Sequence, residues 1–147
     1  MVQVIDTNIE IDAPVADVWA TFSDFERWPD WNPFVISLKG RVALGEKLEV
    51  RIQPPGGKAM TFKPKVVSFE PENELHWLGH LLLPGVFDGR HQFGFESING
   101  DRTRFTHREE FRGLFVGLLM RMLRDKTTRG FEAMNQALKE RVETRSA

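Results

Sequence analysis

A strict alternation of side chains between residues 89 and 112 constrains the fold more than any other feature of this sequence. The odd positions carry Phe93, Phe95, Phe105 and Phe111, whereas the even positions are mostly arginine, glutamate, glutamine or glycine. A period of two is typical of β-strands that have one buried face. The alternation therefore predicts two strands here, each with its odd positions directed inward.

The turn that joins these strands must keep both odd faces on the same side of the sheet. A two-residue Asn99-Gly100 loop would place Phe95 opposite Arg104 and leave an arginine among inward aromatic rings. A three-residue loop over residues 99–101, with Gly100 at positive φ, restores the match. The inward pairs that this register predicts are Phe95–Phe105, Phe93–His107 and His91–Glu109.

The predicted His91–Glu109 pair places an imidazole beside a carboxyl group on an aromatic surface. One interpretation is that the two groups satisfy each other in a core or at the wet end of the sheet. The other is that the inner face lines a cavity, where these groups orient a ligand or move a proton. The cavity is favoured, because a charge buried in a solid core without a partner is costly.

Upstream segments predict a strand, two short helices and then more strands. Residues 5–11 alternate like a half-buried strand, and Pro14 marks the start of a short helix with apolar positions from Val15 to Phe22. The prolines of residues 27–34 stop that helix and indicate a second short helix or an ordered turn. Strands follow from Val35, and the two prolines and two glycines of residues 54–58 predict a hairpin tip.

Residues 74–85 carry a histidine pair that is open to two interpretations. In a helix, His76 and His80 would lie one turn apart and would be able to share a metal ion. In a strand they would lie about 13 Å apart, at about 3.3 Å per residue, which is too far for a common ion. Gly79 and Pro84 favour the strand, so we expect no metal site.

The C-terminal segment predicts one long helix from residue 115 to residue 142. An apolar stripe recurs at steps of three and four residues, with charged residues between its members, and Gly130 is its weak interior position. The stripe consists of Phe115, Leu118, Leu119, Met122, Leu123, Phe131, Met134, Leu138 and Val142. The run from Leu114, followed by Arg121, Arg124, Lys126 and Arg129, also fits an interfacial helix, although such a stripe is more commonly core.

Length and composition narrow the possible classes of function. With 147 residues the chain has the usual size of one domain, so we expect residues 1–147 to form a single domain. The net charge of −1 argues against nucleic acid as a partner. No signal peptide or membrane-spanning segment is expected, and the absence of cysteine favours a cytoplasmic location. Since tyrosine is absent too, an acid–base step would use His, Asp, Glu or Lys.

The order of a strand, two short helices, antiparallel strands and a long helix resembles the helix-grip fold of the START-like, or SRPBCC, superfamily. This superfamily includes polyketide cyclase/dehydrase-like and lipid-transfer proteins. The motifs that carry the resemblance are I-x-I-D-A-P-V-x-x-V-W at 9–19, W-x-x-W-N-P at 28–33, H-x-F-x-F at 91–95 and G-D-R-T-R-F-T-H-R-E-E-F-R-G at 100–113. The resemblance implies an α+β fold whose curved antiparallel sheet wraps around the long helix and encloses an apolar cavity.

A cavity of this kind would have a volume of about 300–1,000 Å³. The resemblance and the inward faces together predict which residues contact a ligand there. These candidate residues are Trp77, His91, Phe93, Phe95, Phe105, His107, Glu109, Leu119 and Met122. The absence of tyrosine is a departure from aromatase/cyclase-like members that place a phenol in the pocket.

Three functions fit these features, and whether the chain is an enzyme stays open at this point. The first is binding or transport of a small, mostly apolar molecule, such as a lipid, a polyketide-like ring or an isoprenoid. The second is a cyclase, dehydratase or hydrolase that uses His91 or His107 as base and Glu109 to orient it. The third is an interaction module whose C-terminal helix binds a membrane surface or a macromolecule. We expect no cofactor and no metal, and the oligomeric state is open, a homodimer included.

Overall fold

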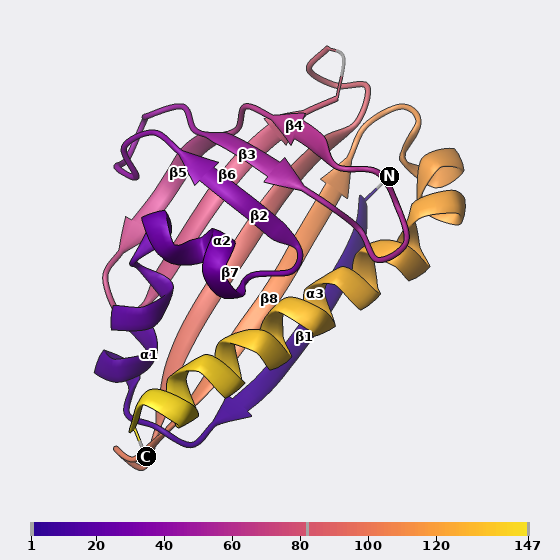
Figure 1. The fold of residues 1–147 in the computed structure, drawn as a ribbon. Coiled ribbons are helices and arrows are strands. Elements are labelled where there is room, and N and C mark those ends of the chain that lie inside the picture. Colours follow the sequence, from indigo (N-terminus) through magenta and orange to yellow (C-terminus); the bar gives the residue numbers. More distant parts are fainter. Residues whose placement is uncertain (1, 82, 147) are drawn as a thin grey trace.

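The computed structural model describes residues 2–81 and 83–146, and its strands form two antiparallel sheets (Figure 1). In chain order the elements are β1 (Val2–Ile11), α1 (Val15–Phe22), the 3₁₀ helix η1 (Phe25–Arg27), α2 (Trp28–Trp31), β2 (Val35–Lys39), β3 (Glu49–Ile52), β4 (Met60–Phe62), β5 (Lys65–Glu70), β6 (Glu74–His80), β7 (Asp88–Ile98), β8 (Arg102–Arg112) and α3 (Val116–Ser146). The larger sheet has the order β1-β8-β7-β6-β5, and the smaller has the order β2-β3-β4. This is the α+β helix-grip arrangement that the sequence predicts.

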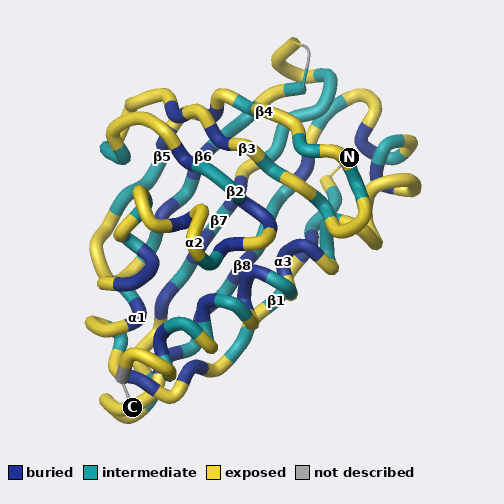
Figure 2. The backbone as a smooth tube through the Cα atoms, viewed as in Figure 1, coloured by how far each residue is buried: buried dark blue, intermediate teal, exposed yellow. Residues whose placement is uncertain are grey.

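The helices and the small sheet cover one face of the large sheet. Helix α3 lies across β1 and β8, whereas α1, α2 and the small sheet lie over β5 to β7 (Figure 1). Buried positions gather between these layers (Figure 2). Phe22, Trp28, Phe93, Phe105 and Phe131 are fully buried there, so the centre of the core is aromatic.

The β7–β8 hairpin has the predicted register. His91 pairs with Glu109, Phe93 with His107 and Phe95 with Phe105. The loop has three residues; Asn99 has φ of 47° and Gly100 has φ of 85°. Because both are in the left-handed region that asparagine and glycine tolerate, the turn closes without turning either aromatic face outward.

The segment between α1 and β2 turns sharply through side-chain hydrogen bonds. Trp28 Nε1 donates to the Phe22 carbonyl at 2.7 Å, which holds α2 against the end of α1. Asn32 Oδ1 accepts from the backbone N–H groups of Phe34 and Val35 at 3.0 and 2.9 Å. These bonds replace the helical ones that Pro33 would interrupt, and they direct the chain into β2.

The histidine pair of residues 76 and 80 lies on a strand, as predicted. His76 lies beside Glu74 and Arg90, and His80 Nδ1 lies 2.7 Å from Asp88. Within residues 2–81 and 83–146, no group of three or more His, Asp or Glu side chains is arranged to hold a metal ion.

The long C-terminal helix is present, but the apolar stripe is buried along only part of it. Phe131, Met134, Leu138 and Val142 are buried, whereas Leu118 and Met122 are 61% and 71% exposed. The first turns of α3 instead bury Val116 and Met120. The prediction of one continuous buried stripe is therefore wrong for these turns. Across the described residues, no helix is both long enough and apolar enough to span a bilayer.

Candidate functional site

An apolar pocket lies between the small sheet, strands β6 to β8 and α3. Its volume is about 160 Å³, which is well below the volume that the sequence analysis predicts. Most of its walls are hydrocarbon, and its polar side chains are few. The lining residues are Phe34, Val50, Ile52, Pro54, Met60, Phe62, Pro64, Trp77, Gly79, His80, Leu81, Phe87, Gly89, His91, Glu109, Phe111, Met120, Leu123 and Thr127. Packing of the aromatic core, not an open cavity, fills most of the space between sheet and helix.

Of the candidate ligand residues, Trp77, His91 and Glu109 line this pocket. The other inward candidates of β7 and β8 pack deeper, against Phe22 and Phe131, and do not line it. These deeper residues are Phe93, Phe95, Phe105 and His107.

The helix candidates Leu119 and Met122 do not line the pocket either, because Met120 and Leu123 occupy the side of α3 that faces it. The physical reason is that every residue of 114–123 except Arg121 is apolar or glycine, so these turns of the helix are apolar on nearly every side. In such a segment the sequence pattern cannot fix which side is buried.

A chain of buried polar groups leads from the pocket into the core. His91 Nδ1 lies 3.5 Å from Glu109 Oε1, and its Nε2 lies 2.6 Å from His107 Nε2. His107 Nδ1 lies 3.0 Å from Asn135 Oδ1 on α3. Asn135 Nδ2 donates to Thr7 Oγ1 on β1 at 2.9 Å, and that hydroxyl donates to the His107 carbonyl at 2.8 Å. We refer to Glu109, His91, His107, Asn135 and Thr7 as the polar chain.

The hydrogen bonds of the polar chain all point the same way, with each group donating to the next one from His91 through His107 and Asn135 to Thr7. A backbone carbonyl only accepts, so Thr7 must donate to it and must accept from the amide nitrogen of Asn135. The amide oxygen of Asn135 then accepts from His107 Nδ1–H, which leaves His107 Nε2 as an acceptor when the ring is neutral. His91 consequently donates from Nε2–H. Its Nδ1 is left with a lone pair that faces Glu109 and the pocket.

Burial keeps the titratable members of the polar chain uncharged. Desolvation lowers the pKa of His107 to about 3, even though hydrogen bonds to Asn135 and to the Phe131 backbone raise it. Desolvation, and then the neighbouring His107, lower the pKa of His91 well below 6.5. Desolvation raises the pKa of Glu109 from 4.5 to about 8. The His91–Glu109 contact is therefore between a neutral imidazole and a protonated carboxyl group and is not an ion pair.

Gly89 on β7 makes the space that the Glu109 carboxyl group occupies. A Cβ at residue 89 would overlap Glu109 Oε2, whereas a Cβ at Gly94 on the same strand would lie 3.7 Å from Thr106 Cβ, an ordinary contact. The 3.5 Å separation from His91 is too long for a strong hydrogen bond. The protonated carboxyl group is thus held at the pocket wall with its donor free to turn toward a bound molecule.

Sequence reasoning missed Asn135, Thr7 and Gly89 as parts of this site. A signal for Asn135 was present, because this amide lies four residues after Phe131, on the side of the helix that the apolar stripe marks as buried. Thr7 lies on the inward side of the first predicted strand. Their contact joins residues 128 positions apart, which only the fold brings together.

A family model described as polyketide cyclase / dehydrase and lipid transport matches residues 2–143. The chain belongs to this family. A comparison with curated protein sequences gave no match. The polyketide cyclase/dehydrase and lipid transport family thus accounts for nearly the whole chain, and the helix-grip fold described above agrees with it.

Solved structures share this fold at low sequence identity. The ZhuI aromatase/cyclase from Streptomyces sp. R1128 superposes with a TM-score of 0.81 at 15% identity, over 100% of this chain and 97% of that one. Norcoclaurine synthase from Thalictrum flavum, with dopamine and hydroxybenzaldehyde, gives 0.75 at 18% identity, over 98% and 88%. A START superfamily protein from Mycobacterium smegmatis gives 0.70 at 20% identity, over 96% and 97%. At these identities the likeness concerns the fold.

Proposed function

We propose that this chain binds a small, uncharged, mostly apolar molecule that carries an oxygen acceptor, with that oxygen placed at Glu109. The observation that carries the proposal is an apolar pocket whose one inward carboxyl group is protonated and backed by a one-way polar chain. Family membership supports ligand binding or cyclase-type chemistry as the general class. The ligand classes we propose are polyketide-like rings, isoprenoids and lipids, and we propose residues 1–147 as one ligand-binding domain in the cytoplasm.

The lining of the pocket favours an uncharged ligand. No lysine or arginine is among the lining residues of the described chain. A carboxylate placed there would be desolvated without a counter-charge, which costs on the order of several kcal/mol. A carbonyl, ether or hydroxyl oxygen would instead accept the Glu109 proton in a hydrogen bond.

The volume of the pocket indicates the size of the group that it holds. The pocket measures about 160 Å³, and an apolar cavity of about 150 Å³ is sufficient for benzene. One ring, or the end of a longer molecule, fits without rearrangement. Trp77 and Phe111 supply aromatic surface for such a ring.

A matched set of probes tests this proposal. Acetophenone has a ring and a carbonyl acceptor, ethylbenzene lacks the acceptor, and benzoate is charged. We expect calorimetric titration to show binding in the order acetophenone, ethylbenzene, benzoate. Glu109→Leu should abolish the preference for acetophenone over ethylbenzene, because it removes the donor. Equal affinity for benzoate, or an unchanged preference in the variant, would refute the proposal.

One observation favours an enzyme as a second candidate function. A carboxyl group with a pKa of about 8 gains and loses its proton near neutral pH, as general acids and bases do. His91 reaches the pocket, whereas both nitrogens of His107 are hydrogen-bonded inside the core, so for this second candidate we propose His91 and not His107 as the base. Exchange of the methyl protons of acetophenone in D₂O, followed by NMR, measures proton transfer directly. An enzyme should lose this exchange in Glu109→Gln while retaining acetophenone binding, whereas a binding protein shows no exchange at all.

A further inference from the structure

A cluster of exposed apolar side chains covers the start of α3 and the loop between β6 and β7. Leu83 is 68% exposed, Leu114 80%, Phe115 46%, Leu118 61% and Met122 71%. The loop and the helix start are held together, because the N–H groups of residues 114 and 115 donate to the carbonyls of residues 85 and 86. We call these five residues the apolar face. Solvent exposure of so many large apolar groups together is unusual for a surface without a partner.

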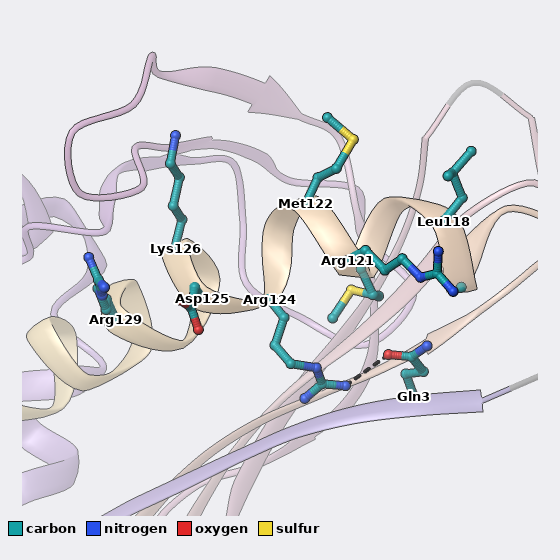
Figure 3. A pocket seen from close by; sticks show the side chains of 10 residues that line it. Gln3, Leu118, Arg121, Met122, Arg124, Asp125, Lys126 and Arg129 are labelled. Carbon is teal, nitrogen blue, oxygen red and sulfur yellow. Dashed lines mark hydrogen bonds between the residues drawn. The ribbon is translucent and has the colours of Figure 1, made fainter.

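Basic side chains border the apolar face along the same helix. The basic residues of this part of α3 are Arg121, Arg124, Lys126 and Arg129. Asp125 is the acidic residue among them. Together they line a broad surface depression of about 970 Å³ (Figure 3). Figure 3 shows the side chains of residues 118, 122 and 126 projecting to one side of α3, while Arg124 reaches Gln3. The whole chain has a charge of −1, so this positive charge is local.

The apolar pocket is lined by other residues of the same elements. Leu81, Leu123, Thr127 and Met60 line the pocket and come from the same loop, the same helix and the adjacent strand β4. Met60 is 50% exposed and Leu123 is 38% exposed, so the rim is itself apolar.

We propose that the apolar face and its basic border dock on an anionic lipid surface. Apolar side chains on one part of a helix and lysine or arginine on the next are the two elements that hold a helix in a membrane interface. Each basic group near an anionic surface contributes about 1 kcal/mol. The docking and the binding of a ligand in the pocket are separate properties, and the first does not depend on the second.

Charge argues against a second copy of the chain as the occupant. A two-fold interface places the same patch on both subunits. The basic border of one subunit would therefore face the basic border of the other, or would lie unpaired at the edge of the interface. Juxtaposed like charges oppose association. An anionic bilayer, by contrast, complements the border and receives the leucine, phenylalanine and methionine side chains.

Vesicle flotation tests the docking. The full chain is mixed with vesicles of phosphatidylcholine alone or of phosphatidylcholine with phosphatidylglycerol, at low and high salt. We expect it to float with the anionic vesicles and to be released by salt. Leu118→Glu with Met122→Glu, and separately Lys126→Glu with Arg129→Glu, should each lower the partition coefficient by about tenfold or more.

Two control variants match the test variants in chemistry but lie elsewhere. Leu44 is 70% exposed in the loop before β3, and Arg41 is exposed in the same loop, so Leu44→Glu and Arg41→Glu should leave flotation unchanged. Absence of flotation at low salt, or an equal loss in the controls, would overturn the proposal. So would a wild-type dimer in sedimentation that Leu118→Glu with Met122→Glu dissociates, because the face would then belong to a second copy. Acetophenone titration of the same variants should be unchanged, which separates docking from ligand binding.

Discussion

Asn135 connects the pocket to the core through a single amide group. Its oxygen faces His107 and its nitrogen faces Thr7, and the Thr7 hydroxyl is fixed by a backbone carbonyl. The orientation of one side chain thereby selects the tautomers of two histidines. A residue that does not line the pocket thus controls whether His91 Nδ1 presents a lone pair or a proton to Glu109.

Asn135→Leu should lower the free energy of unfolding by about 1–3 kcal/mol, because it leaves the buried Nδ1–H donor of His107 and the hydroxyl acceptor of Thr7 without their amide partner. Urea denaturation measures this change. Gln136→Leu, on the next residue of α3, is the control. Its side chain is exposed and donates to Glu140, so a change within about 0.5 kcal/mol is expected. Equal effects of the two substitutions would contradict the role of the polar chain.

At the scale of elements, two close approaches to glycine set the geometry of the site. Strand β7 passes the Glu109 carboxyl group at Gly89, and helix α3 passes the Phe34 ring at Gly130. Phe34 lines the pocket and packs edge-on to Phe131, with ring centroids 5.5 Å apart. Neither glycine has a positive φ, so both are required by space and not by backbone conformation.

Gly89→Ala should displace the Glu109 carboxyl group and weaken acetophenone binding by about tenfold, which corresponds to about 1.4 kcal/mol. It should also change the pKa of Glu109 in a carboxyl ¹³C NMR titration. Gly94→Ala on the same strand meets only an ordinary contact at 3.7 Å and should change neither quantity. If both alanine variants bind acetophenone like the wild type, the proposed contact between the ligand oxygen and the Glu109 carboxyl group is incorrect.

Gly130→Ala should destabilise the protein by about 1–3 kcal/mol through overpacking against Phe34. At an open position in a helix the same substitution stabilises by about 1 kcal/mol, so the sign is diagnostic. Thermal or urea unfolding measures it. In a Phe34→Leu background the cost should shrink, and a double-mutant cycle that shows no coupling would exclude this contact as the cause.

An element was predictable from the sequence where it has one apolar face and one polar face. It was less predictable where nearly all of its faces are apolar. The β7–β8 register was predictable because each strand has one apolar face, and a shift by one residue would have exposed Phe105. The last turns of α3 were predictable for the same reason. Its first turns were not, since every residue of 116–123 except Arg121 is apolar or glycine. The pocket volume was not predictable either, because it depends on how aromatic rings such as Phe22 and Trp28 fill the core.

For the whole molecule, the buried titratable groups make stability depend on pH in two directions. His91 and His107 have folded pKa values below 6.5, so the unfolded chain binds more protons at acid pH and stability is lost as the pH falls below about 6.5. Glu109 has a folded pKa of about 8 against 4.5 unfolded, so stability is lost as the pH rises toward 8. Below pH 6.5 the two histidines outweigh the one carboxyl group.

The free energy of unfolding of the wild type should therefore be highest near pH 6.5 and fall by about 1–2 kcal/mol up to pH 8. Urea denaturation across this range measures the fall. Glu109→Gln should remove it, because glutamine does not titrate. Glu96→Gln, an exposed change on β7, should leave the fall intact. An identical slope in Glu109→Gln and the wild type would show that Glu109 is ionised in the folded protein.

The edge position of β4 has a consequence for the range of molecules that the pocket admits. Strand β4 is an outer strand of the small sheet, and its Met60 lines the pocket while 50% exposed. An unbranched methionine side chain changes rotamer at the cost of apolar contacts and not of ladder hydrogen bonds. The pocket would then discriminate strongly at the oxygen held by Glu109 and weakly at Met60. A homologous series of phenyl alkyl ketones should accordingly bind with affinities that change little as the alkyl tail lengthens.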